Sequence, residues 1–175
     1  MKGKTCNESR VVRMDLVLPN DTNNHNTLFG GVLMKHIDAI ASIAARKHCR
    51  TEIVTASTDS VDFLYPISPN DSFFLEAFVT WVGTTSVEVF VKAIAEDFNT
   101  EKRRIAATAF LTFVSVGRSK ENPVPFIIPE TDEEKKLHET GAERDEARKK
   151  RRLKSKELAS FLTTNAPWEE KKTLI

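Results

Sequence analysis

Residues 30–48 read GGVLMKHIDAIASIAARKH, and this stretch decides the fold. Its apolar residues recur at steps of four, three and four, and this spacing puts them on one side of an α-helix. These residues are Leu33, Ile37, Ile40 and Ala44. Basic residues at 46–48 fall in the expected last turn, where cations favour the negative end of the helix dipole. We therefore predict a buried helix over residues 30–48 that opens with two glycines.

Segments typical of strands lie on both sides of this helix. One loosely alternating segment precedes it and ends at Pro19, and four segments rich in Val, Ile, Thr or Phe follow it; together they span residues 9–18, 53–65, 72–82, 85–95 and 104–116. The short intervals between the later segments favour antiparallel neighbours over crossovers. The order β-α-β-β-β-β predicts an α+β fold in which a five-stranded antiparallel sheet wraps around the helix.

The composition changes after Gly117. Three prolines interrupt ENPVPFIIPE at residues 121–130, and residues 131–162 are mostly Glu, Lys, Arg and Ala. We predict a Pro-rich arm and then one charged helix, which Thr131 and Glu134 begin as a capping box. The expected domains are therefore residues 8–118 for the sheet and helix, and residues 119–175 for the arm and the charged helical extension.

The overall charge excludes two classes of protein. The 175 residues carry 26 Lys and Arg against 25 Asp and Glu, so the chain is neither a strongly basic nucleic-acid protein nor an acidic tail protein. No apolar run approaches the roughly 20 residues that cross a bilayer, and the start MKGKTCNESR lacks the apolar core of a secretory signal. We expect a cytoplasmic protein without a membrane partner. Cys6 and Cys49 are too few for a disulfide framework or an ordinary metal site, so two free thiols are predicted.

The motifs of several enzyme classes are missing. The chain contains no G-x-S-x-G, H-E-x-x-H, G-x-x-x-x-G-K-[ST] or G-x-G-x-x-G, which disfavours a serine hydrolase, a metallopeptidase and an NTPase. A polar loop that runs into a glycine pair remains, in PNDTNNHNTLFGGVLMKHID at residues 19–38. First-turn N–H groups at Gly30 and Gly31 are candidates for an oxyanion hole, because glycine lets a ligand approach the backbone closely. The alternative is that the glycines only allow a tight turn into the helix.

Two titratable residues of this segment are candidates for a general base. Asp38 borders the small-residue face of the helix, and burial there would raise the pKa of its carboxyl towards the working range of a base. The alternative is a half-exposed carboxylate at the edge of the apolar stripe. His25 lies in the polar loop and is a rival base, because imidazole as a chemical group suits proton transfer near neutral pH; the alternative is a solvated loop histidine.

The string P-x-D-x-N-x-x-x-x-x-F-G-G-x-L-M-x-x-x-D at residues 19–38, with VTASTDSVDFLYPI behind it, resembles the hotdog-fold acyl-CoA thioesterases. The closest similarity is to bacterial cytosolic acyl-CoA hydrolases related to the brain-type acyl-CoA thioesterase of animals. It extends over about residues 8–165 and includes NPVPFIIPETDEEKKLHE and RKKRRLKSKEL. The resemblance implies a hotdog domain at 8–118 that hydrolyses fatty acyl-CoA to fatty acid and coenzyme A, with no metal or redox cofactor.

The resemblance also implies an active site. Its catalytic asparagine falls on Asn23, its catalytic aspartate on Asp38, and a threonine of the following strand on Thr55. Asp38 activates water or attacks directly, and Asn23 comes from the partner protomer of a dimer. A trimer of such dimers is expected. Asn26 stands where many relatives carry Gly, and Phe29 where some carry His, and both differences affect the shape of the loop.

Coenzyme A contacts are predicted in two places. The turn at 82–86 offers backbone N–H groups and hydroxyls at Gly83, Thr84 and Ser86, and Arg104 offers positive charge; the alternative is an ordinary hairpin and a solvated arginine. The basic run RKKRRLKSK at 148–156 could bind phosphates or nucleic acid, or form a solvated helix face balanced by nearby acidic residues. We expect no nucleic-acid partner. A non-catalytic acyl-CoA-binding module remains the alternative function.

Overall fold

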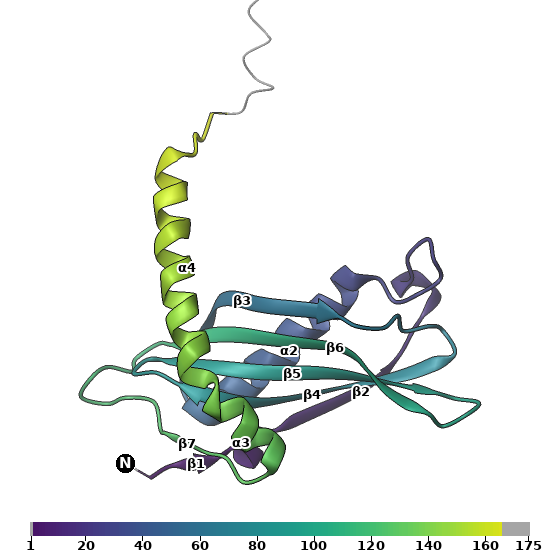
Figure 1. The fold of residues 1–175 in the computed structure, drawn as a ribbon, viewed down its shortest axis with the longest axis horizontal. Coiled ribbons are helices and arrows are strands. Elements are labelled where there is room, and N and C mark those ends of the chain that lie inside the picture. Colours follow the sequence, from purple (N-terminus) through teal and green to yellow (C-terminus); the bar gives the residue numbers. More distant parts are fainter. Residues whose placement is uncertain (1, 166–175) are drawn as a thin grey trace, which may run out of the picture. The chain divides into compact units, whose positions relative to one another are not determined.

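The computed structural model describes residues 2–165. Its main feature is a five-stranded antiparallel sheet with the strand order β2-β4-β5-β6-β3 (Figure 1). The strands are β2 (Val11–Leu16), β3 (Ile53–Phe63), β4 (Asp71–Val82), β5 (Ser86–Asp97) and β6 (Arg103–Ser115). The predicted α+β class and the five antiparallel strands are confirmed. The two edge strands, β2 and β3, come from opposite sides of the helix in the sequence.

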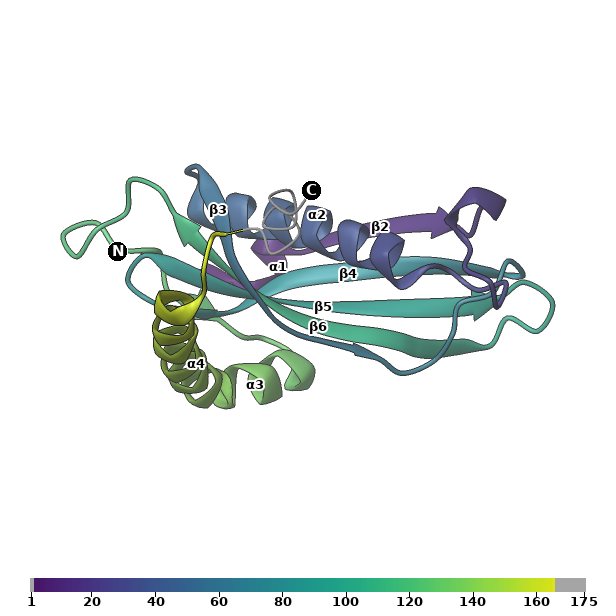
Figure 2. The ribbon, with the colours of Figure 1, turned by 90° about the horizontal axis from the view of Figure 1, so that it is seen from above.

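Helix α2 (Gly30–Cys49) lies on one face of this sheet (Figure 2). The predicted stripe is its buried side, since each of Leu33, Ile37, Ile40 and Ala44 is at most 4% exposed. The helix ends at Arg50, which adopts the left-handed conformation with φ 56° and donates its N–H to the Arg46 carbonyl at 2.9 Å. The periodicity therefore placed both the helix and its buried face correctly.

The N-terminal segment differs from the predicted strand over 9–18. Residues before Arg10 form β1 (Lys4–Thr5), which pairs in parallel with β7 (Ile127–Ile128), and the short helix α1 (Cys6–Ser9). Ser9 is buried, donates its hydroxyl to the Cys6 carbonyl and accepts a hydrogen bond from the Val79 N–H. This contact with β4 holds Ser9 in the helix, so the strand begins only at Val11. The polar loop then starts with a single turn of 3₁₀ helix, η1 (Pro19–Asp21).

The C-terminal part forms two helices where one was predicted, α3 (Asp132–Glu139) and α4 (Gly141–Phe161). The capping box of Thr131 and Glu134 is confirmed. The helix is interrupted where Gly141 approaches the indole of Trp81, since a Cβ on Gly141 would lie only 2.5 Å from Trp81 Cε3. The chain divides into two compact units after Gly141, so the Pro-rich arm and α3 belong to the same unit as the sheet.

The basic run in α4 is partly neutralised within the helix itself. Asp145 pairs with Arg148 and, at 2.6 Å, with Lys149, while Glu146 pairs with Lys150 at 2.7 Å. Such pairs three or four residues apart are typical of an exposed helix face. Lys149 and Lys150 are exposed and paired with acidic residues, as the alternative of a solvated, charge-balanced helix face predicts, whereas the Arg148 side chain is mostly buried.

Two expectations from composition can be compared with the described residues. Cys6 and Cys49 are free and buried, as predicted. Burial, with the nearby Glu134 carboxylate, raises the pKa of the Cys6 thiol to about 12, and burial also raises the pKa of Cys49. Neither thiol is therefore a candidate nucleophile at neutral pH. Within residues 2–165, no helix has the length and apolar character needed to cross a membrane.

Candidate active site

The polar loop before α2 is folded around the side chain of Asn23. Its Oδ1 accepts hydrogen bonds from the backbone N–H of His25 at 2.9 Å and of Thr27 at 3.3 Å. The backbone N–H of Asn23 also donates to the Thr27 carbonyl at 2.9 Å, and Asn26 takes the left-handed conformation between them with φ 55°. An asparagine suits position 23 because its side-chain amide can satisfy nearby backbone groups in a turn. Asn23 is thus half-buried and fixed in orientation.

A cavity of about 360 Å³ lies beside Asn23. Asn23 and Thr27 form its polar border, and most of the rest of the wall is apolar, with Leu33 from α2 and Phe63 and Tyr65 from β3 and the segment after it. A mainly apolar wall with a few polar groups at one side is typical of small-molecule sites. The cavity can hold an apolar chain while a polar group stays near Asn23.

The N-terminus of α2 opens onto this cavity through Gly30. The helix begins without a side-chain cap, and the first helical bonds run from Val32 and Leu33 to the Phe29 carbonyl. Within residues 2–165, the N–H groups of Gly30 and Gly31 have no acceptor. A Cβ on Gly31 would lie 2.6 Å from Phe29 Cε1, so only glycine fits there while the ring keeps its place. Free first-turn N–H groups of this kind can stabilise a developing oxyanion.

Asp38 lies in the middle of α2 and contacts the neighbouring edge strand. The Thr55 hydroxyl donates a hydrogen bond of 3.2 Å to Asp38 Oδ1, and both residues are exposed in the single chain. Of the two alternatives for Asp38, the single chain shows the carboxylate at the edge of the apolar stripe and not the buried one. The register of β3 against β6 shifts directly after Thr55. Such irregularities can re-aim a side chain next to an active site.

One chain does not bring all the predicted catalytic residues together. Asn23 and Gly30 line the cavity at the N-terminal end of α2. Asp38 follows Gly30 by eight residues, which is about 12 Å along the helix axis at 1.5 Å per residue. The structure therefore joins Asn23 with Gly30, and Asp38 with Thr55, as two separate groups.

The residues predicted to bind coenzyme A also lie apart. The Gly83 N–H donates to the Ser86 carbonyl at 2.8 Å in the hairpin turn between β4 and β5, which also contains Thr84. Arg104 on β6 pairs with Ala95 on β5. Ala95 follows Ser86 by nine residues along β5, so Arg104 lies about 30 Å from the turn. Their contact with coenzyme A stays a prediction, but Arg104 and this turn cannot bind one phosphate group within a chain.

Arg104 has a structural partner in the buried Asp71. Its guanidinium donates to Asp71 Oδ2 at 2.6 Å and to the Pro66 carbonyl at 3.1 Å, and so ties the β3–β4 connection to β6. Burial alone would raise the pKa of the Asp71 carboxyl, but hydrogen bonds from Arg104 and Ser68 outweigh it and hold the pKa below its ordinary value. Asp71 is therefore a charged, fully paired anchor of this connection.

The structure also shows the surroundings of His25, the rival base, and an apolar wall that the sequence analysis did not assign. His25 is exposed and uses only its backbone N–H on Asn23, as expected for a solvated loop histidine. The apolar wall of Phe63, Leu64 and Tyr65 was not identified beforehand. The available signal was the run of three large apolar residues at the end of the segment 53–65, which breaks the alternation expected of a strand.

Comparison with known proteins identifies the family of the chain. Residues 25–101 match the model of the thioesterase superfamily. An acyl-CoA thioester hydrolase of Bacillus subtilis, itself uncharacterised, is 57% identical over 164 residues, covering 93% of this chain and 95% of the relative. The crystal structure of an acyl-CoA hydrolase from Bacillus cereus superposes with a TM-score of 0.87 at 51% identity, covering 93% of this chain and 99% of the other. An acyl-CoA hydrolase of Staphylococcus aureus gives 0.84 at 43% identity, covering 90% and 97%. The chain therefore belongs to the thioesterase superfamily, within its hotdog-fold family of acyl-CoA thioester hydrolases.

Proposed function

We propose that this protein hydrolyses fatty acyl-CoA thioesters to free fatty acids and coenzyme A. The observation that carries the proposal is the Asp38 carboxylate held by Thr55 on the exposed flank of α2. The relatives support it, since they are named for this reaction, and the Staphylococcus aureus structure contains butyryl coenzyme A and coenzyme A. The cytoplasmic location and the lack of a metal or redox cofactor expected from the sequence belong to the same proposal.

The reaction consumes one water molecule. Asp38 accepts a proton from this water as its oxygen attacks the thioester carbonyl carbon. The N–H groups of Gly30 and Gly31 hold the oxygen of the tetrahedral intermediate, an effect often worth about 3–4 kcal/mol per donor. The C–S bond then breaks, and the sulfur of coenzyme A takes the proton from Asp38. Asn23 orients the water and the thioester in this scheme.

A complete site in this scheme needs two copies of the chain. Asn23 and the glycine N–H groups of one copy face Asp38 and Thr55 of another, because within one chain the two groups stay apart. The surface beside Asp38 and Thr55 supports such pairing, since Val54 is more than half exposed there. The edge strand β3 also offers unpaired backbone groups along one side.

A trimer of these dimers is the larger assembly that we propose. The structural neighbours include a hexameric acyl-CoA thioesterase at 42% identity, with a TM-score of 0.80 over 86% of this chain. A second hexameric thioesterase of broad specificity superposes with a TM-score of 0.57 at 26% identity.

The spacing of three residues supports their assignment. Structures of the Staphylococcus aureus enzyme exist with alanine in place of an asparagine, of an aspartate fifteen residues later, and of a threonine seventeen residues after that. Asn23, Asp38 and Thr55 have the same residue types at the same spacing. The same three positions were thus selected for mutation in that relative.

Thiol release from a series of acyl-CoA substrates tests the proposed function. The purified protein is expected to release coenzyme A, and Asp38→Asn is expected to lower turnover about 10²–10⁴-fold, as loss of a general base commonly does. Asp62→Asn is the matched control, because Asp62 is another exposed carboxylate and lies on the same strand as Thr55. Binding of acyl-CoA without thiol release at any chain length would instead identify a non-catalytic acyl-CoA-binding module.

A further inference from the structure

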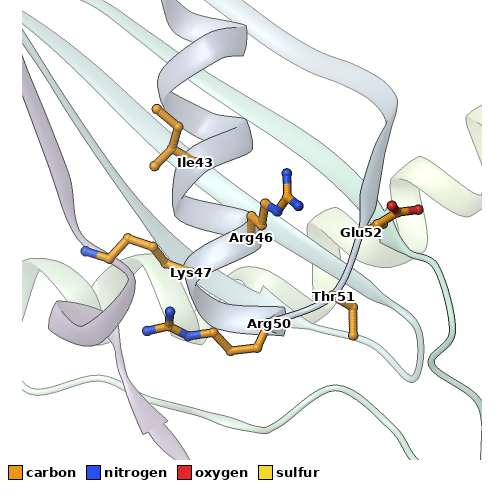
Figure 3. Close-up of a pocket in the computed structure, with 6 residues that line it drawn as sticks. All are labelled: Ile43, Arg46, Lys47, Arg50, Thr51 and Glu52. Carbon is orange, nitrogen blue, oxygen red and sulfur yellow. The ribbon is translucent and has the colours of Figure 1, made fainter.

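The C-terminal end of α2 borders an open groove that the proposed chemistry does not use. Its cavity measures about 510 Å³ and lies between α2 and the start of β3 (Figure 3). The six lining residues are Ile43, Arg46, Lys47, Arg50, Thr51 and Glu52. Three of them are cations and one is a carboxylate, so the groove has a net positive charge.

Two of these cations are not needed to hold the fold. The last carbonyls of α2 already have cationic partners, since Lys4 donates to the His48 carbonyl and Arg118 donates to the Cys49 carbonyl at 2.7 Å. Lys47 donates to the Arg10 carbonyl at 2.7 Å. In contrast, the guanidinium groups of Arg46 and Arg50 are exposed and form no hydrogen bond or ion pair within residues 2–165. They are therefore available to an anionic ligand.

Arg46 lies on a ridge of α2 with Asp38, and Arg50 is the left-handed residue that ends this helix. They follow Asp38 by eight and twelve residues, and residues four apart form one ridge on a helix surface. At 1.5 Å per residue, they lie about 12 and 18 Å from Asp38 along the axis. The chain at the start of β3 lies alongside this part of α2. Thr55 contacts Asp38, and Thr51, four residues earlier, lines the groove with the arginines. The side of α2 that faces β3, the track, therefore carries the proposed base and, towards its C-terminal end, the two arginines.

Acyl-CoA has a shape that matches this track. Its thioester and its phosphate groups lie at opposite ends of the pantetheine arm, which is long enough to span several helical turns. The predicted coenzyme A turn lies at the same end of the sheet, since the Ser115 N–H donates to the Thr85 carbonyl at 2.7 Å while the Ser115 hydroxyl contacts the Thr51 hydroxyl. Arginine is well suited to phosphate, because its planar fork donates two parallel hydrogen bonds.

We propose that Arg46 and Arg50 bind phosphate groups of the coenzyme A moiety, with the pantetheine arm lying along the track from Asp38. This inference rests on the proposed hydrolysis of acyl-CoA. It separates recognition of the leaving group, at the C-terminal end of α2, from the chemistry at Asp38. Glu52, on the opposite side of the groove in Figure 3, excludes phosphate from the strand side by repulsion.

The double variant Arg46→Gln/Arg50→Gln tests this inference against two substrates with the same acyl group. One is acyl-CoA, and the other is the S-acyl pantetheine, which lacks the phosphates and the nucleotide. The KM for acyl-CoA is expected to rise about tenfold or more at low ionic strength and less at high salt, because salt screens exposed charges. The kcat for acyl-CoA and both constants for the pantetheine substrate are expected to stay unchanged. Lys35→Gln, which removes an exposed cation from the same helix, is the matched control.

A binding measurement separates this inference from the hydrolysis itself. Adenosine 3′,5′-bisphosphate, the nucleotide end of coenzyme A, is titrated calorimetrically into the wild type and the double variant. The wild type is expected to bind it and the double variant to bind it at least about tenfold more weakly. An unchanged KM for acyl-CoA in the double variant overturns the inference, whether or not the bisphosphate still binds, and so does an equal loss with S-acyl pantetheine. A wild type that binds the bisphosphate but releases no thiol contradicts the proposed function instead.

Discussion

The Thr55 hydroxyl donates a hydrogen bond of 3.2 Å to Asp38 Oδ1 and so connects the middle of α2 to the edge strand β3. The two residues are seventeen positions apart, and the contact depends on α2 lying against the edge of the sheet at this height. It leaves the other carboxylate oxygen free of Thr55. The carboxylate is therefore oriented on an exposed surface, where water and a thioester can reach it.

Thr55→Val removes this donor while keeping the shape of the side chain. Turnover is expected to fall about fivefold to tenfold with little change in KM, because one hydrogen bond contributes about 1 kcal/mol. Thr55→Ser keeps the hydroxyl and is expected to retain most of the activity. Steady-state kinetics on acyl-CoA measure both variants. Wild-type turnover in Thr55→Val would remove Thr55 from the positioning of Asp38.

The Asp71–Arg104 ion pair predicts a dependence of stability on acid. Because the native pKa of Asp71 is below its unfolded value of about 3.9, the pair stabilises the fold fully above that pH and loses its effect as the pH falls through the native pKa. Asp71→Asn is thus expected to be less stable than the wild type near neutral pH, and the difference is expected to shrink below about pH 4. Thermal unfolding from about pH 7 to about pH 3 measures this. A difference that stays constant over this range contradicts the prediction.

Arg104→Gln removes the cation from the same pair. The free energy of unfolding is expected to fall by about 1–3 kcal/mol, since the Asp71 carboxylate is buried and loses its main donors. Denaturant titration at neutral pH measures the loss, and Arg103→Gln is the matched control because its guanidinium is mostly exposed. Equal stability of the two variants would show that Arg104 does not anchor the β3–β4 connection.

Gly31→Ala tests the oxyanion site at the start of α2. The new Cβ would lie 2.6 Å from Phe29 Cε1, so the exposed Phe29 ring must turn at the helix N-terminus. Turnover is expected to fall at least about tenfold, because full loss of one oxyanion donor costs about 10²–10³-fold. Gly30→Ala is the milder change, since its Cβ would meet Phe63 at an ordinary 3.4 Å. Equal turnover of Gly31→Ala and the wild type would contradict the assignment.

The elements that were predictable from sequence are those whose residues carry a local pattern. The apolar steps in residues 30–48 define α2, and Thr131 and Glu134 define the start of α3, because each signal acts within a few residues. The interruption before α4 was not predictable, since it depends on Gly141 meeting Trp81, sixty residues earlier in the chain.

In the candidate site, too, the features set by local sequence were predictable and those set by distant contacts were not. The polar loop and the glycine pair identified the Asn23 side of the site, but the exposure of Asp38 depends on where α2 lies relative to the edge of the sheet. The partner of Arg104 was equally hidden, because Asp71 is thirty-three residues away and meets it only through the pairing of β4, β5 and β6.

The central claim is that Asn23 and Asp38 of different copies form one active site, and mixed dimers test it most directly. Asn23→Ala and Asp38→Asn chains are given different affinity tags and produced together, and dimers that carry both tags are purified. Each variant alone is expected to be folded and nearly inactive. The mixed dimer is expected to regain thiol release from acyl-CoA, because it restores one intact pair across the interface. A purified mixed dimer that stays as inactive as its parents would contradict the account and place both residues in the site of a single chain.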